Sequence, residues 1–180
     1  TSMQIDNVEL VSASSETPQD VQVKLYNNGF ENGFTQWSRT NMVNQTIKAE
    51  GGKVFTHIAG SEAYTSDLWQ FANAPTDGNY QLSISTRKSG NFENASLYAT
   101  YSGGTKEVPI PASGDWKEVK IPNIQLMNGE VVKVGVKADG QEGSVLDVDD
   151  MKMTKMDSSV PLDVSYFESL DEVTPYTVTD

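Results

Sequence analysis

The stretch from Tyr80 to Arg87 alternates between apolar and polar side chains, and this alternation constrains the fold more than any other feature of the sequence. Tyr80, Leu82, Ile84 and Thr86 share one parity, whereas Gln81, Ser83, Ser85 and Arg87 share the other. Successive side chains of a β-strand point to opposite faces of the sheet. The stretch is therefore predicted to be a strand with one face in a core and the other open to solvent or ligand.

Short segments of the same kind recur along the chain, and Gly, Asn and Asp turns separate them. None of the segments has the period of a helix. Strands are expected at 21–25, 45–49, 53–58, 64–71, 95–101, 106–110, 116–121, 130–138 and 144–154. Many short strands with such turns predict an all-β fold, namely a two-sheet antiparallel β-sandwich with the connectivity of a jelly roll.

The last of these strands contains a slip in its alternation. Leu146 and Val148 share one parity, while Met151 and Met153 take the other, so one extra residue is expected to form a β-bulge at Asp149-Asp150. The same pattern occurs at 5–11, ahead of a polar segment. We therefore divide the chain into the last strand of a preceding module plus a linker (1–20), one β-sandwich (21–155), and an acidic tail or the start of another domain (156–180).

Composition and charge exclude several classes of function. The chain has no Cys and a single His, so it has no disulfide, no thiol nucleophile, no thiolate metal site and no multi-histidine zinc site. Its net charge of −12 comes mostly from the two terminal segments, since 21–155 holds fifteen acids and thirteen bases. A nearly neutral body argues against nucleic acid and favours an uncharged partner. No apolar run approaches the roughly 18 residues of a membrane helix, so no membrane insertion is expected.

Several motifs resemble, in their order, those of bacterial β-sandwich carbohydrate-binding modules. They are Asn28 to Gly33 with Trp37, Tyr64 and Gln70 followed by Asp77 to Ser83, Trp116, Ile124 to Gly129, and Val148 to Met151. The resemblance covers 21–155 and is closest to the galactan-binding, family 61-like modules of endo-β-1,4-galactanases. His57 departs from it, because family members often carry an aromatic residue in this strand.

This resemblance implies a non-catalytic module that binds a polysaccharide and targets an attached enzyme or cell-surface protein to it. β-1,4-Galactan is the first expectation for the ligand, and starch or another glucan is the second. The module is expected to be extracellular or attached to a bacterial cell surface, monomeric, and covalently linked to neighbouring domains. The alternative is a structural spacer or adhesion domain without a sugar site.

The resemblance also implies a structural Ca²⁺ between the first and last strands. Glu31, Asp149 and Asp150 are the expected side-chain ligands, and a carbonyl near Lys53 is expected to join them. Hard oxygen ligands of this kind suit Ca²⁺. Two adjacent carboxylates at a bulge repel each other unless they share a cation.

A neutral glycan offers CH faces for stacking and hydroxyl groups for polar contacts. The predicted binding residues are Gln70 beside the outward row Gln81, Ser83, Ser85 and Arg87, with Tyr64, Tyr98 and Tyr101 as stacking residues and Trp69 as a further candidate. If Gln70 faces the ligand, its neighbour Trp69 faces the core unless the indole reaches a loop. Trp37 and Trp116 are expected to pack in the structure.

Catalysis is not expected. Glycosidases use paired carboxylates roughly 5–9.5 Å apart. The clustered acids of this chain are assigned to the calcium site or fall in the terminal segments. No combination of a nucleophile and a base is visible in the sequence.

Overall fold

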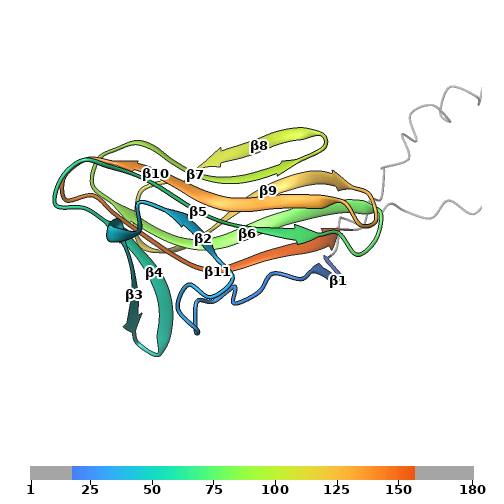
Figure 1. Ribbon diagram of the computed structural model, residues 1–180, viewed down its shortest axis with the longest axis horizontal. Coiled ribbons are helices and arrows are strands. Elements are labelled where there is room, and N and C mark those ends of the chain that lie inside the picture. The colour runs from blue at the N-terminus through green and yellow to red at the C-terminus, as the bar shows by residue number, and fades with distance from the viewer. Residues whose placement is uncertain (1–17, 157–180) are drawn as a thin grey trace, which may run out of the picture.

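Two antiparallel β-sheets pack face to face in the computed structural model, which describes residues 18–156 (Figure 1). Sheet A contains, in spatial order, β3 (Gln45–Glu50), β4 (Lys53–Ala59), β11 (Val145–Met156), β6 (Gly78–Ser89) and β9 (Ser113–Leu126), and β1 (Pro18–Val23) also pairs with β11. Sheet B contains β2 (Ser38–Thr40), β5 (Tyr64–Asn73), β10 (Val131–Gly140), β7 (Phe92–Tyr101) and β8 (Gly104–Pro109). A 3₁₀ turn, η1 (Met42–Asn44), precedes β3.

The eight strands from β4 to β11 have the connectivity of a jelly roll. Within this set, sheet A places the first, eighth, third and sixth strands side by side, and sheet B places the second, seventh, fourth and fifth. Successive strands from β4 to β8 therefore alternate between the sheets until β7 and β8 form a hairpin. The predicted all-β antiparallel sandwich is confirmed.

The core lies between the sheets, and the alternation in β6 supplies much of its sheet A side. Tyr80, Leu82 and Ile84 are fully buried, as the period-two pattern predicts. From sheet B, Leu97 on β7 and Val136 on β10 are equally inaccessible to solvent. Burial of a side chain of this size contributes about 1.5–3 kcal/mol to folding, so the inward parity of each strand is strongly fixed.

The slip in the last strand is a β-bulge. The pairing of β11 with β6 shifts register between Asp149 and Lys152, and Asp150 has a φ of 52°. The bulge keeps both Val148 and Met151 in the core, where each is fully buried. One extra residue therefore switches the parity of the strand while its apolar side stays inward.

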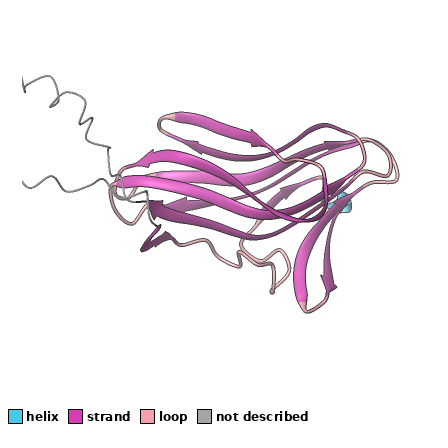
Figure 2. Ribbon diagram, turned by 180° about the vertical axis from the view of Figure 1, so that it is seen from behind, coloured by secondary structure: helices cyan, strands magenta, loops and turns pink. Residues whose placement is uncertain are grey.

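The β3–β4 hairpin projects from the body of the sandwich, as both views of the ribbon show (Figures 1 and 2). Gly51 and Gly52 form its turn with φ values of 59° and 82°, a conformation that glycine adopts without strain. The hairpin lies at one edge of sheet A, where β4 pairs with β11. It therefore rises beside the outer face of that sheet.

Some strand boundaries differ from the expected ones. The first strand begins at Pro18 and ends at Val23, so it includes residues that the sequence placed in a linker. The short strand β2 was not predicted at all. The strand expected at 5–11 and nearly all of the acidic segment 156–180 lie outside the described residues. Within the described part of the chain, no helix is long and apolar enough to cross a membrane.

Candidate functional site

The outer face of sheet B carries a row of residues that are paired across all five strands. The pairs join Ser38 to Trp69, Trp69 to Gly135, Gly135 to Tyr98, and Tyr98 to Glu107. Directly paired residues point to the same side of a sheet. We call the side chains at the centre of this surface, Asp67, Trp69, Phe71, Tyr98, Lys133 and Lys137, the aromatic face.

Tyr98 forms the floor of the aromatic face. Its side chain is only 1% exposed, and its hydroxyl group donates a hydrogen bond of 2.9 Å to Asp67. The ammonium groups of Lys137 and Lys133 lie 4.7 Å and 5.3 Å from the centroid of its ring. Burial, followed by the negative charge of Asp67, raises the pKa of Tyr98 well above its ordinary value. The hydroxyl group therefore stays protonated at physiological pH and holds Asp67 in place.

Trp69 and Phe71 provide aromatic surface that a ligand can reach. Phe71 is 61% exposed, and Trp69 is half-buried. The Lys133 ammonium lies 4.4 Å from the centroid of the Trp69 ring and 3.6 Å from the Asp67 carboxylate. Rings of this kind stack on the CH faces of a sugar, and the neighbouring carboxylate and ammonium groups match its hydroxyl groups.

Glu107 lies at one end of the row and is held as an ionised hydrogen-bond acceptor. Hydrogen bonds from Ser96 and Asn94, together with the charge of Lys137, lower the pKa of Glu107, although partial burial opposes them. The acidic Asp67 and Glu107 thus offset Lys133 and Lys137. The surface is close to neutral in charge and rich in both donors and acceptors.

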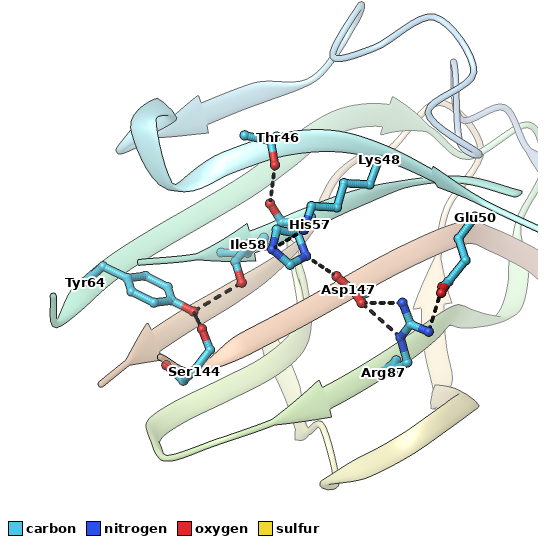
Figure 3. A network of polar contacts seen from close by, with 9 residues as sticks. All are labelled: Thr46, Lys48, Glu50, His57, Ile58, Tyr64, Arg87, Ser144 and Asp147. Carbon is cyan, nitrogen blue, oxygen red and sulfur yellow. Dashed lines mark hydrogen bonds and ion pairs between the residues drawn. The ribbon is translucent and has the colours of Figure 1, made fainter. Parts of the chain in front are cut away.

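Two of the predicted sugar ligands, Gln70 and Tyr64, are buried and do not reach this surface. Gln70 is 3% exposed, and its amide group bonds to the backbone NH and carbonyl of Tyr26 at 3.0 Å and 3.2 Å. The Tyr64 hydroxyl group donates toward the carbonyl groups of Ile58 and Ser144 (Figure 3). The expected orientation of β5 is therefore reversed, since Gln70 points inward and Trp69 points outward.

The other predicted residues lie on different surfaces of the sandwich. Tyr98 joins Trp69, whereas Tyr101 is half-buried and packs against the edge of the core. The row Gln81, Ser83, Ser85 and Arg87 lies on the outer face of sheet A, as the alternation predicts, with Ser83 only 8% exposed. Packed sheets are roughly 10 Å apart. The single platform expected from the sequence is therefore two surfaces on opposite sides of the sandwich.

Sequence reasoning did not select Asp67, Phe71, Lys133 and Lys137. The pattern of β10 contained a signal for two of them, because Val132, Val134 and Val136 alternate with Lys133, Gly135 and Lys137. Cross-strand pairing then brings both lysines against Tyr98 and Trp69. This juxtaposition depends on the order of the strands, which one strand's pattern does not contain.

The expected calcium ligands come together around Gly29. A Cβ atom placed on Gly29 would lie 3.6 Å from Asp150 Oδ1, 3.7 Å from Asp149 Oδ1 and 3.8 Å from Glu31 Oε1. The Lys53 ammonium group bonds to Asp149 and Asp150 at 2.7 Å and 3.3 Å. The hydrogen bond with Asp149 is the main cause that raises the pKa of Lys53.

The oxygen donors around Gly29 are of the type that Ca²⁺ takes. As placed, however, no three His, Asp or Glu side chains within residues 18–156 are close enough together to hold a metal ion. Lys53 enters this cluster through its ammonium group, whereas the sequence suggested its carbonyl. A bound cation would have to compete with that ammonium group for the carboxylates.

Comparison with known proteins gives relatives of low identity. No family model matches the sequence. A 1,6-alpha-glucosyltransferase of Sporosarcina globispora is 23% identical over 171 residues, and the match covers 84% of this chain. The chain spans only 13% of the length of that relative.

Solved structures with a similar fold include carbohydrate-binding modules and cyclases. TmCBM61, solved in complex with β-1,4-galactotriose, aligns with a TM-score of 0.65 and 24% identity, over 73% of this chain and 97% of its own. A family 16 carbohydrate-binding module aligns with a TM-score of 0.56 and 12% identity, over 71% and 96%. A cyclase from Fischerella sp. TAU has the same TM-score at 14% identity, over 81% and 99%. The chain therefore has the β-sandwich fold of carbohydrate-binding modules and, among them, is similar in fold to the family 61 module.

Proposed function

We propose that this chain is a non-catalytic carbohydrate-binding module that binds a polysaccharide on the aromatic face. The observation that carries this proposal is the geometry around Trp69. A partly exposed indole ring lies beside the hydrogen-bonded Asp67 carboxylate and the Lys133 ammonium group, on an inner strand of sheet B. Stacking surface next to fixed polar groups is the combination that a sugar ring requires.

A neutral glycan fits this face better than a charged one, because the two lysines and two carboxylates offset each other. β-1,4-Galactan is the first candidate, since a module of similar fold was solved with a β-1,4-linked galactotriose. Starch or another glucan is the second, since the curated relative is a glucosyltransferase. Only a few stacking and polar contacts form on such a face, so we expect a Kd from roughly micromolar to millimolar.

The test is retention on a panel of polysaccharides that includes galactan, starch and other β- and α-glucans. The wild-type chain should bind one of them, and Trp69→Ala should weaken that binding at least about tenfold, as the loss of one stacking contact implies. Tyr26→Ala is the matched control, because Tyr26 is 50% exposed and lies outside the aromatic face. A folded wild-type chain that binds no glycan would instead support a spacer or adhesion domain.

Under the same proposal, the module is not itself an enzyme. A similar sandwich fold occurs in a cyclase, so the absence of catalysis requires a separate experiment. The two ring nitrogens of His57 contact Asp147 and Lys48, and neither contact is with a hydroxyl nucleophile. Incubation with the bound polysaccharide should release no reducing ends over days, whereas steady release would contradict the proposal.

Within this proposal, the module targets an attached enzyme or cell-surface protein outside the cell. It also binds Ca²⁺ through Glu31, Asp149 and Asp150 as a structural ion. Their carboxylate oxygens all lie near Gly29, which supports this role, but the three side chains would have to close around the ion and displace the Lys53 ammonium group. Binding of the ion to the native state alone would stabilise the fold.

A further inference from the structure

The outer face of sheet A contains a hollow of about 310 Å³, on the side of the sandwich opposite the aromatic face. Its walls come from β3, β4, β6 and β11. The lining residues are Lys48, Ala49, Glu50, Phe55, His57, Arg87 and Asp147. We call this space the hairpin hollow, because the projecting β3–β4 hairpin forms one side of it.

Asp147 lies at the base of the hairpin hollow and is 3% exposed. It pairs in register with His57 on β4 and with Arg87 on β6. One carboxylate oxygen contacts His57 Nδ1 at 2.7 Å, and the other accepts hydrogen bonds from Arg87 at 3.0 Å and 2.9 Å (Figure 3). A buried carboxylate with this many partners is fixed in position.

His57 forms part of the wall of the hairpin hollow. Its Nε2 atom lies 2.9 Å from the Lys48 ammonium group, which carries only donors. Nε2 must therefore accept in this contact, and Nδ1 donates to Asp147. The contacts of His57 with Asp147 and Lys48 thus fix the imidazole ring and place the Lys48 ammonium group, which keeps further donors, beside the hollow.

A second pair spans the hairpin hollow. Glu50 on β3 contacts Arg87 on β6 at 2.8 Å, although β4 and β11 lie between these strands. In a regular sheet, three strand spacings amount to about 14 Å, so both side chains extend across the hollow. The Arg87 guanidinium lies 5.5 Å from the centroid of Phe55 and 5.1 Å from that of Trp116. Aromatic and planar groups therefore border the same space as the polar atoms.

We propose that the hairpin hollow is a second saccharide site, which takes one neutral sugar residue at the end of a glycan chain. A neutral ligand follows from the charges, since Lys48 and Arg87 are offset by Glu50 and Asp147. A single residue follows from the size, which is at the lower end of the range of roughly 300–1,000 Å³ for small-ligand pockets. The site is expected to take the end of a chain, because the hairpin closes one side of the hollow. An internal sugar residue would need room for the glycan to leave on both sides. This inference rests on the proposed function as a carbohydrate-binding module.

Two sites on opposite faces have a consequence for the whole module. They cannot both hold one short oligosaccharide, but they can hold two glycan chains or two distant parts of one chain. The second binding event on a polysaccharide then occurs at a high effective concentration. The module would therefore link glycan strands as well as adhere to one of them.

The test uses ¹⁵N-labelled protein titrated with β-1,4-galactotriose and, separately, with maltotriose. One of these probes should shift two separate groups of amide signals, around Trp69 and around His57, with two equivalents bound. The double variant Lys48→Ala/Glu50→Ala should lose the shifts around His57 and keep those around Trp69. Both side chains are on the exposed hairpin, and the variant leaves the Asp147–Arg87 contacts in place.

The matched control is Lys120→Ala/Glu118→Ala, which removes an exposed ion pair of 2.9 Å from β9 on the same sheet. This control should keep both groups of shifts. Trp69→Ala should retain the shifts around His57 alone. The ability of the wild-type chain to cross-link a soluble polysaccharide, seen as turbidity, should disappear in both the Trp69 and the hairpin variants.

The outcomes separate the two claims. One bound equivalent, with shifts confined to the aromatic face, would overturn the hairpin hollow and leave the proposed function intact. Complete loss of binding in Trp69→Ala would also overturn the second site. Shifts around His57 alone would support the hairpin hollow and remove the aromatic face from the proposal. No shifts with either probe would overturn the hollow for these sugars, while the polysaccharide panel would still decide the proposed function.

Discussion

At the scale of single residues, the aromatic face depends on Gly135. A Cβ atom at this position would lie 2.5 Å from the Leu68 carbonyl oxygen, 2.7 Å from the Tyr98 hydroxyl oxygen and 2.8 Å from Trp69 Cβ. One of these contacts is with backbone and another is with the stem of the indole, so neither moves easily. The missing side chain is what allows Tyr98 to lie across β10 and bond to Asp67.

Gly135→Ala should therefore lower both stability and sugar binding. Overpacking in a rigid setting costs about 1–3 kcal/mol, and displacement of Tyr98 releases the Asp67 carboxylate. Thermal unfolding measures the first effect, and polysaccharide retention at a temperature where the variant is folded measures the second. Gly114→Ala is the control, because nothing lies within 4 Å of its Cβ position. Unchanged binding in the folded Gly135 variant would contradict the role given to Tyr98.

The contrast between Trp69 and Gln70 shows where sequence reasoning fails at this scale. The outward parity of β5 includes Trp69 and Phe71, and the inward parity includes Ser66 and Gln70, so hydrophobicity does not identify the core face. Gln70 is buried because the Tyr26 backbone satisfies its amide group. That partner is 44 residues away in the chain, and no local pattern in β5 indicates it.

At the scale of elements, β6 and β11 were predictable because apolar residues alternate with polar ones along each strand. The bulge in β11 was also predictable, since two apolar residues before it share one parity and two after it share the other. By contrast, β2 has only three residues and no buried position, and it exists through its pairing with β5. The sequence thus predicted the elements whose own side chains enter the core. The elements that depend on a partner strand, and the separation of the two outer faces, required the topology.

The bulge in β11 also leads to a prediction about Ca²⁺. Millimolar Ca²⁺ should raise the melting temperature of the wild-type chain, and a chelator should reverse the effect. At 100 times its Kd, a ligand of the native state contributes about 2.7 kcal/mol. Asp149→Asn should remove the response because Asp149 is the buried member of the pair, whereas Asp115→Asn, at an exposed position of β9, should respond like the wild type. If neither Ca²⁺ nor the chelator changed the melting temperature, the calcium proposal would be wrong and Lys53 would be the cation that neutralises the two carboxylates.

At the scale of the whole molecule, the two proposed sugar surfaces rest on a single core. Ile84 from sheet A and Leu97 from sheet B are both fully buried and belong to the same apolar cluster. Neither side chain belongs to either binding surface. Because each sheet buries its inward face only against the other, neither sheet is expected to remain folded alone.

Ile84→Ala and Leu97→Ala should therefore each destabilise the whole sandwich by about 2–5 kcal/mol and leave a single cooperative transition. Circular dichroism follows the strands, while tryptophan fluorescence follows Trp37 in the core together with Trp69 on one face and Trp116 on the other. The two signals should give one melting temperature in each variant, and Val43→Ala, at a position 84% exposed, should match the wild type. Each folded core variant should also keep glycan binding on both faces at low temperature. Separate transitions for the two probes would instead contradict a single cooperative unfolding of the two sheets.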